Sequence, residues 1–450
     1  MIQHPRRAVL AALAVLLLAR VPGWAAPILD PAHVHEHALA NGLRIIVKEE
    51  RGWGVVSVGA FVRCGLRYDP PDLPGAAHFM EHMLFRIDTG AGQPSELVQA
   101  VEGRGGQINA QTNRDSVSVQ LVTSPRTLPD LWPILARTLL QPTLTDEAVA
   151  EEKKVIAQEI AERAGQAVEA LTAAVWAAAY PNHPYGRSIG GTAQSVEAVD
   201  AAKLREYHGR FFRPDNMALI LVGDVRAEEV FSQVQQAFGS LPSGTGDWTA
   251  PPAEAPFDGP KTEVQTQNVM ATLVGLGFRG PGIERKRDVC AMDLIYTLLS
   301  DGRQARFTTE LEEKGLVNAF DLQYITQHDD GLVLITAATP PDKELEARSA
   351  ITEQLRKLAE EGVTEEELAR GKRVLRNSYA FSNEAYSDQV GSLGFYEMID
   401  TYRFAIDYID AVNQVTPEDI KRVAAEYLAG DRAVLVIFRP PTPSRPGTEV

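Results

Sequence analysis

Cysteine is nearly absent from this chain. Only Cys64 and Cys290 occur among its 450 residues. Two cysteines can form neither a disulfide framework nor a cysteine-ligated zinc site, so both of these classes are excluded. The two residues fall in different predicted domains. They could pair in an oxidising compartment, but we expect two separate buried thiols.

Basic residues are outnumbered by acidic ones. Lys and Arg total 44 against 60 Asp and Glu, which gives a formal net charge of −16. Such an acidic surface repels phosphate backbones and has no basic stripe, so we expect no nucleic-acid partner. The hydrophobic fraction of 44% and the charged fraction of 23% are ordinary for a globular protein and exclude a fibre or extensive disorder. A chain of 450 residues exceeds one hydrophobic core, so we expect two domains.

Long hydrophobic runs are missing as well. The apolar run at 8–19 has about a dozen residues, which is too short to cross a bilayer, and no later segment is long enough. Arg6 and Arg7 precede this run and Gly23-Trp24-Ala25 offers a small-x-small cleavage pattern, so residues 1–25 are typical of an export signal. We therefore predict a periplasmic protein without a stable membrane span, if the source has two membranes. The alternative is an uncleaved anchor.

A long internal repeat indicates how the chain is organised. The stretch VDAAKLREYHGRFF from Val199 is similar to VTPEDIKRVAAEYL from Val415, and the same offset of 216 aligns Leu204 with Ile420. Both copies have the pattern of a helix, a turn and an apolar strand. A repeat of this length indicates two similar domains rather than a solenoid. The stretch at 241–261 is rich in Pro, Gly and Ser, which is typical of a linker.

We predict an N-terminal domain at 30–242, a linker at 243–262, a C-terminal domain at 263–440 and a flexible tail at 441–450. Strands and helices do not strictly alternate, which favours an α+β fold with helices packed on a mostly antiparallel sheet in each domain. Strand patterns fall at 43–48, 55–63, 106–112, 116–122, 269–278 and 332–337. Helical patterns fall at 76–85, 95–102, 146–163, 201–211, 285–299, 343–361 and 365–378.

The helical stretch at 76–85 contains His78-Phe79-Met80-Glu81-His82. Residues at i, i+3 and i+4 share a helix face, so His78, Glu81 and His82 should point the same way, while apolar residues occupy the rest of the helix. Two imidazoles at this spacing can bind one zinc ion, and the Glu can accept a proton from water. This H-x-x-E-H order is the inverse of the commoner zincin motif. The structural alternative is a pair of hydrogen-bonded helix histidines.

A catalytic zinc ion also needs a third protein ligand. The acidic helix at 146–163 supplies candidates, because Glu152 and Glu159 lie seven residues apart and share a helix face. One of them can bind the metal while the other supports a ligand. A second H-x-x-E-H match occurs at 33–37, but its three histidines at a period of two suggest an extended edge strand, where the helical argument fails. Adventitious metal binding is the more plausible reading there.

These residues resemble the pitrilysin (insulinase) family of zinc peptidases, M16, which includes mitochondrial processing peptidase. The resemblance runs from about residue 34 to residue 438 and includes HFMEHMLF at 78–85, PNHPYGRSIGGT at 181–192 and YHGRFFRPDNMALILVGDV at 207–225. It implies that Glu159, 77 residues after His82, is the third ligand and that Glu152 supports the site. The same spacing after His37 reaches Arg114, which separates the two H-x-x-E-H matches.

The resemblance also implies how substrate binds. The segment GGQINAQTNRD at 105–115 is similar to the family's substrate strand, so Asn109, Ala110 and Thr112 would line the cleft and bind peptide by strand addition. A chain of this size would be half of a clamshell, so two chains would have to associate.

One segment departs from the family pattern. Active members usually carry a stretch like R-E-K-x-G-L-x-Y in the second half, whereas this chain has Glu312 in place of the Arg and Asn318 in place of the Tyr. A carboxylate cannot replace a guanidinium that grips a carbonyl. Tyr324 is nearby but stands six residues late. The resemblance therefore implies a heterodimer in which a related M16-like chain supplies Arg and Tyr, with a homodimer as the alternative.

The expected function is that of a zinc-dependent endopeptidase acting on peptides or small unfolded polypeptides. Zn²⁺ would be bound by His78, His82 and Glu159, and Glu81 would be the catalytic base. A non-catalytic structural or chaperone-like subunit is the alternative, although the complete ligand set argues against it. A metal-binding protein that uses the histidines at 33–37 is a third reading.

Overall fold

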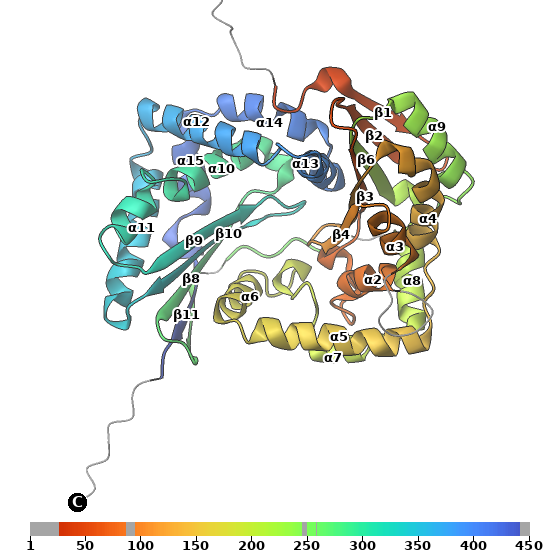
Figure 1. The fold of residues 1–450 in the computed structure, drawn as a ribbon. Helices are drawn as coiled ribbons and strands as arrows, with labels where there is room; N and C mark the ends of the chain where they lie inside the picture. Colours follow the sequence, from red (N-terminus) through yellow and green to blue (C-terminus); the bar gives the residue numbers. More distant parts are fainter. Residues whose placement is uncertain (1–26, 87–94, 245–249, 258, 442–450) are drawn as a thin grey trace, which may run out of the picture.

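A computed structural model describes residues 27–86, 95–244, 250–257 and 259–441 of the chain (Figure 1). The predicted export signal and the predicted tail beyond residue 441 lie outside the described residues. Within the described ranges, no helix combines the length and the apolar character that a membrane crossing requires.

The first sheet has six strands in the described residues, in the order β1-β2-β6-β3-β5-β4. Strand β2 runs parallel to β6, and the other neighbouring pairs are antiparallel. The bounds are β1 Val34–Ala38, β2 Arg44–Glu49, β3 Val56–Val62, β4 Gln107–Thr112, β5 Val117–Thr123 and β6 Met217–Gly223.

The second sheet has the order β7-β11-β8-β10-β9, with β7 parallel to β11 and the other pairs antiparallel. Apart from the extra strand β1, this order repeats that of the first sheet strand for strand. The prediction of two similar α+β domains is therefore confirmed. The bounds are β7 Lys261–Thr266, β8 Thr272–Arg279, β9 Ala319–Ile325, β10 Leu332–Thr339 and β11 Val434–Arg439.

The helices expected from the sequence are present, with ends that differ by three residues or fewer. Side chains of Ser95, Thr145, Asp200 and Thr364 accept an N–H in the first turn of the helix that each precedes, which explains where these helices begin. The bounds are α2 Ala76–Leu84, α3 Glu96–Glu102, α5 Asp146–Ala164, α8 Ala201–Phe211, α10 Lys286–Ser300, α11 Glu344–Glu360, α12 Glu365–Phe381 and α15 Pro417–Tyr427.

Six further helices were not assigned from the sequence. They are α4 Leu128–Leu140, α6 Ala167–Ala179, α7 Ala193–Glu197, α9 Ala227–Phe238, α13 Tyr386–Ile399 and α14 Arg403–Asn413. Two of them, α6 and α13, cross between the halves of the molecule. In Figure 1, α6 from the first half lies beside the second sheet, and α13 from the second half lies beside the first sheet.

The exchange of α6 and α13 buries one face of each sheet. Leu171 and Val175 of α6 pack in one apolar cluster with Leu334 and Val436 of the second sheet. Val390 and Leu393 of α13 pack in another cluster with strands of the first sheet. The opposite face of each sheet packs against helices of its own half. Each half therefore needs the other to bury its sheet.

Glycines on the facing strands allow the exchanged helices to approach closely. A Cβ atom at Gly275 of β8 would lie 2.7 Å from Val175 of α6, and one at Gly59 of β3 would lie 2.6 Å from Val390 of α13. Gly275 follows Gly59 by the repeat offset of 216. In both halves, a glycine inside a strand therefore leaves room for the helix that comes from the other half.

The two cysteines lie in separate cores. Cys64 and Cys290 are free and buried, as expected. Burial raises the pKa of both thiols, which makes them unreactive.

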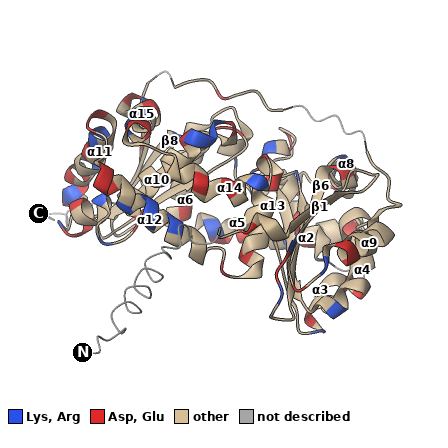
Figure 2. Ribbon diagram, turned by 90° about the horizontal axis from the view of Figure 1, so that it is seen from above, with Lys and Arg blue, Asp and Glu red and all other residues tan. Residues whose placement is uncertain are grey.

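Charged side chains of both signs are mixed on the outer helices. Figure 2 shows Lys and Arg interspersed with Asp and Glu on α11 and α12. On α11, Arg356 pairs with Glu353 at 2.7 Å and also with Glu360. Exposed pairs of this kind contribute little stability individually.

Candidate metal centre

Helix α2 carries the His-x-x-Glu-His motif and is fixed at its start by a buried carboxylate. Gly75 precedes the helix at φ 93°, where glycine is favoured. The Oδ2 atom of Asp69 accepts the Gly75 N–H at 2.7 Å, and its Oδ1 atom accepts the Ala77 N–H at 3.0 Å. These bonds satisfy amides at the helix start that have no intrahelical partner, so Asp69 sets where α2 begins.

The apolar residues of α2 face the first core, and the polar trio faces helix α5. Phe79, Met80 and Met83 are buried in that core. His78 is 6% exposed, and its ring centroid lies 4.6 Å from that of His82.

Three possible ligand atoms converge between α2 and α5. The Oε2 atom of Glu159 lies 3.7 Å from Nε2 of His78 and 3.4 Å from Nε2 of His82. All three atoms lie within 4.8 Å of one another. In the part of the chain that the structure describes, this is the one group of three or more His, Cys, Asp or Glu side chains with such geometry.

The residues present fit a zinc ion. Zinc ligands at about 2.0–2.2 Å in a tetrahedron stand about 3.3–3.6 Å from one another. The observed separations of 3.4 and 3.7 Å are close to that spacing. Two imidazoles and one carboxylate are the ligand set of several zinc hydrolases and leave a fourth position open.

Glu152 supports His82 from outside this ligand group. Its Oε1 atom accepts a hydrogen bond from Nδ1 of His82 at 2.8 Å, and its Oε2 atom lies 2.6 Å from Nη1 of Arg86. Arg86 also pairs with Glu151. A proton held on Nδ1 leaves the lone pair of His82 on Nε2, the atom that faces Glu159.

Glu81 lies beside the three ligand atoms and is fixed from the first sheet. The hydroxyl of Thr112, the last residue of β4, donates a hydrogen bond to Oε2 of Glu81. This contact connects β4, the edge strand of the first sheet, to α2, the helix that carries the motif.

Burial and neighbouring groups shift the pKa values of all three polar residues of the motif. Burial, with the nearby charge of His82, lowers the pKa of His78 to about 3, so this imidazole is neutral and able to bind a metal. Burial also lowers the pKa of His82, but the hydrogen bond and charge of Glu152 outweigh it and the net shift is upward. Burial raises the pKa of Glu81, and the Thr112 hydrogen bond offsets part of that rise. A raised pKa suits a carboxylate that accepts and returns a proton.

Two family models match successive parts of the chain. The model described as Insulinase (Peptidase family M16) matches residues 44–193, which include His78, His82 and Glu159. The model described as Peptidase M16 inactive domain matches residues 198–375. The chain belongs to the M16 peptidase family.

Relatives of this M16 chain span nearly its whole length. An uncharacterized zinc protease of Mycobacterium leprae is 28% identical over 402 residues, which cover 88% of this chain and 90% of the relative. Zinc protease PqqE of Helicobacter pylori is 26% identical over 89% of this chain and 92% of its own. A probable mitochondrial-processing peptidase subunit beta of Arabidopsis thaliana is 25% identical over 89% of this chain and 77% of its own.

Solved structures share the fold. The crystal structure of a protease from Helicobacter pylori has a TM-score of 0.84 at 25% identity and covers 90% of this chain and 99% of its own. A peptidase M16 inactive domain from Pseudomonas fluorescens has a TM-score of 0.80 at 21% identity. It covers 92% of this chain and 100% of its own, and at this identity it supports the fold alone.

The expected substrate strand of this M16 chain is β4, which lies at the edge of the first sheet. Asn109 is exposed, and both Asn109 and Ala110 line a cavity of about 580 Å³ beside the strand. Ala110 packs against the first core, and Thr112 is buried against Glu81. Of these three residues, Thr112 bonds directly to the motif, and the substrate-binding role of all three stays a prediction.

The second H-x-x-E-H match lies in an extended edge strand, as expected, and its histidines do not come together. The ring of His37 stacks on Phe231 with centroids 5.0 Å apart. The Nε2 atom of His35 lies 3.9 Å from Glu49. Strand β1 thus separates side chains that a helix would bring together.

Glu312 and Asn318 lie between α10 and β9 in the second half. Glu312 ends a short helical turn at Thr308–Glu312, and the Asn318 N–H donates to the Ala338 carbonyl at 2.7 Å. The Tyr324 hydroxyl donates to the Pro281 carbonyl at 2.7 Å. Tyr324 is therefore held inside its own domain.

Sequence reasoning did not find Arg86 or the contact between Thr112 and Glu81. Arg86 stands four residues after His82, and Glu151 and Glu152 are adjacent acidic residues on α5. Helical spacing and opposite charge could therefore have predicted the role of Arg86. The contact between Thr112 and Glu81 joins residues on different elements, which no local pattern predicts.

Proposed function

We propose that this chain is a zinc-dependent endopeptidase that hydrolyses peptides or small unfolded polypeptides. The convergence of Nε2 of His78, Nε2 of His82 and Oε2 of Glu159 within 4.8 Å carries the proposal. The position of Glu81 in the same motif supports it, as do relatives that are named zinc proteases.

The proposed roles follow from the positions of the side chains. His78, His82 and Glu159 would bind Zn²⁺, which when bound supplies a Lewis acid that lowers the pKa of water toward neutrality. Glu81 accepts one proton from the attacking water while the water oxygen forms a bond to the scissile carbonyl carbon. Glu81 then gives that proton to the amide nitrogen as the C–N bond breaks. Thr112 holds the Glu81 carboxylate in place, and Glu152 holds the His82 ring.

The edge of β4 is the proposed binding surface for the substrate backbone. An edge strand presents N–H and C=O groups that an extended peptide can pair with. Because Thr112 at the end of β4 contacts Glu81, a peptide added along this edge passes the motif. Side chains on one face of the added peptide would lie near Asn109, and those on its other face would lie near Ala110.

We also propose that the chain acts with a second M16-like chain. Glu312 and Asn318 replace the expected Arg and Tyr, and Tyr324 is held by Pro281. A heterodimer whose partner brings these groups would complete the site. Strong peptidase activity from the purified chain as a homodimer would refute this division of roles.

Export is part of the proposal. The apolar run at 8–19 and the cleavage pattern at 23–25 support a periplasmic protein that loses residues 1–25. N-terminal sequencing of protein from a periplasmic extract tests it, and an intact residue 1 would contradict it.

The direct test of the enzymatic role is Glu81→Gln. We expect the variant to keep its zinc and to lose about 10²- to 10⁴-fold in the rate of peptide hydrolysis, because the amide cannot carry the proton. Glu162→Gln is the matched control, since Glu162 lies on α5 and bonds to Gln158 rather than to the motif. Hydrolysis of an unfolded peptide mixture by each variant assembled with its M16-like partner, followed by mass spectrometry, measures both. Undiminished cleavage by Glu81→Gln would end the proposal.

A further inference from the structure

A carboxylate from the second half reaches the surroundings of helix α2. Asp329 lies in the turn between β9 and β10, and Arg67 lies in the short helical turn η2, Leu66–Tyr68. The Nε atom of Arg67 lies 2.5 Å from Oδ2 of Asp329, and Nη2 lies 3.0 Å from Oδ1. Arg67 is only 4% exposed, so this two-pronged pair joins the halves in a sheltered place.

Other polar side chains surround Asp329, which is itself partly exposed. Nε2 of His183 and Nδ1 of His328 each lie 3.2 Å from its carboxylate. Its N–H donates to the Tyr185 hydroxyl at 3.3 Å, and that hydroxyl donates to Oδ1 of Asp115 at 2.6 Å. We call these six residues the seam cluster: Arg67, Asp115, His183, Tyr185, His328 and Asp329.

The seam cluster connects to the start of the metal helix. Arg67 stands two residues before Asp69, whose carboxylate accepts the N–H groups of Gly75 and Ala77. His78 follows directly in the first turn of α2. A chain of contacts therefore runs from η2 through Asp69 to the first turn of α2, which carries His78.

The seam cluster connects equally to the strand that holds Glu81. The Arg67 N–H donates to the Arg114 carbonyl at 2.8 Å, in the turn that follows β4. A Cβ atom at Gly65 would lie 2.6 Å from the Asn113 carbonyl, so η2 rests directly on this turn. Thr112, the donor to Glu81, immediately precedes that turn.

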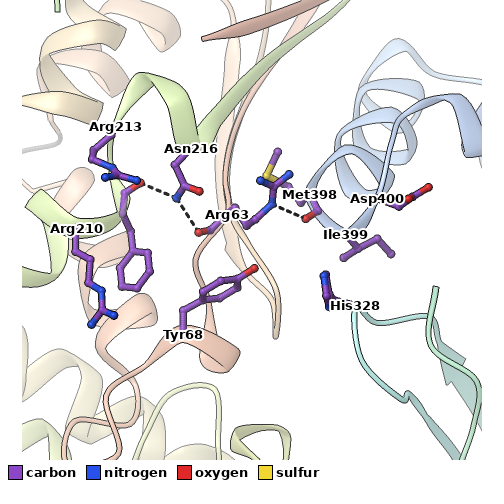
Figure 3. Close-up of a pocket in the computed structure, with 10 residues that line it drawn as sticks. Arg63, Tyr68, Arg210, Arg213, Asn216, His328, Met398, Ile399 and Asp400 are labelled. Carbon is purple, nitrogen blue, oxygen red and sulfur yellow. Dashed lines mark hydrogen bonds between the residues drawn. The ribbon is translucent and has the colours of Figure 1, made fainter. Parts of the chain in front are cut away.

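A cavity lies between the halves beside the seam cluster. Tyr68 and His328, the chain neighbours of Arg67 and Asp329, line a cavity of about 470 Å³ that Met398 and Ile399 line from the second half (Figure 3). Figure 3 shows Arg63 spanning this cavity to the Met398 carbonyl. Beside this cavity, the bond from Arg63 to Met398 and the pair of Arg67 and Asp329 are polar contacts between the halves.

We propose that Asp329 is a positioning residue for the metal centre, through which the half without metal ligands sets the geometry of His78 and Glu81. The inference rests on the proposed peptidase function. It gives the second half a role within its own chain, apart from any contribution by a partner.

The test is Asp329→Asn, with Glu397→Gln as the matched control. Glu397 is a carboxylate of α13 that is 1% exposed and pairs with Arg44 of β2, so it also joins the halves but has no contact with η2. Both variants should lower the melting temperature. Only Asp329→Asn should change the visible absorption of the Co²⁺-substituted protein, which reports ligand geometry. It should also lower kcat about 10- to 100-fold with little change in KM, because small misplacements of reacting groups are costly.

Arg67→Lys keeps the charge but not the two-pronged geometry, and should reproduce the Co²⁺ spectral change if Asp329→Asn fails to fold. Asp329→Glu should restore part of kcat. A wild-type Co²⁺ spectrum and kcat in folded Asp329→Asn, with the same loss of melting temperature as Glu397→Gln, would overturn the inference. If the wild-type chain cleaves no peptide even when assembled with its M16-like partner, the proposed function fails, whereas the Co²⁺ spectra still decide this inference.

Discussion

The contact between Glu152 and His82 gives the sharpest prediction about the metal centre. Glu152 makes two charge-assisted bonds, to His82 at 2.8 Å and to Arg86 at 2.6 Å. In Glu152→Gln, the amide oxygen can still accept the His82 proton, but its NH₂ group then faces the Arg86 guanidinium, where two donors meet. The hydrogen bond to His82 weakens, and the imidazole becomes a poorer ligand.

We expect zinc affinity to fall about 10- to 100-fold in Glu152→Gln, which is the usual effect of removing a support for a metal-bound histidine. That loss corresponds to about 1.4–2.8 kcal/mol of binding free energy. Competition with a chromophoric chelator at neutral pH measures it. The fold should survive, because the substituted side chain keeps its size.

Glu151→Gln is the matched control for this measurement. Glu151 is the preceding residue on α5 and also pairs with Arg86, but its side chain is 45% exposed and does not touch His82. We expect its zinc affinity to stay within about twofold of wild type, since exposed pairs contribute little. Equal affinities for Glu151→Gln and Glu152→Gln would refute the assigned role of Glu152.

Three further predictions concern stability and metal content. Burial raises the pKa of Asp329, but its hydrogen bonds in the seam cluster outweigh this and lower it well below the ordinary value, so Asp329→Asn should lose about 2 kcal/mol of unfolding free energy at pH 7. This loss should stay nearly constant down to about pH 4, the ordinary pKa of the carboxyl, and should shrink as the pH falls further toward the lowered pKa of Asp329; a loss independent of pH in urea titrations would contradict this. Gly275→Ala should lower the melting temperature because its Cβ atom would collide with Val175 of α6. Gly209→Ala is the control and should not lower it, since a Cβ atom there would have no atom within 4 Å. Equal melting temperatures for the two variants would argue against close packing of α6 on β8. Replacing the three histidines at 33–37 by Ala should leave the zinc content unchanged in atomic absorption, and a loss of zinc would move the site to β1.

The sequence predicts the repeated parts of the fold well. Strand patterns such as 106–112 and 332–337 correspond to β4 and β10, because an alternating or continuous apolar pattern depends only on which face is buried. Capping residues such as Ser95 and Thr364 mark helix starts for a similarly local reason. The repeat at 199 and 415 then indicates that the two halves share a topology.

The exchange of helices could not be predicted in this way. The alanine-rich helix α6 has an apolar character on several sides, which indicates burial but not against which sheet. Gly275 carries the complementary signal, since a glycine inside a strand indicates close approach of another element. That signal does not identify α6 as the partner.

In the candidate site, too, local patterns could be predicted from the sequence and tertiary contacts could not. Helical spacing brings His78, Glu81 and His82 to one face, and the separation of Glu152 from Glu159 places both on one face of α5. The position of Asp329 beside Arg67 depends on a contact between residues 262 positions apart, and only tertiary structure can create it. The strand pattern predicts β4, and the resemblance adds that Asn109, Ala110 and Thr112 line the substrate cleft, which stays a prediction.

Anomalous diffraction from crystals grown with zinc is the most direct test of the metal centre. The peak recorded above the zinc absorption edge should lie between Nε2 of His78, Nε2 of His82 and Oε2 of Glu159, at bonding distance from all three. A zinc-loaded crystal with its strongest peak at the histidines of β1, or with Glu159 turned away from the ion, would contradict the account.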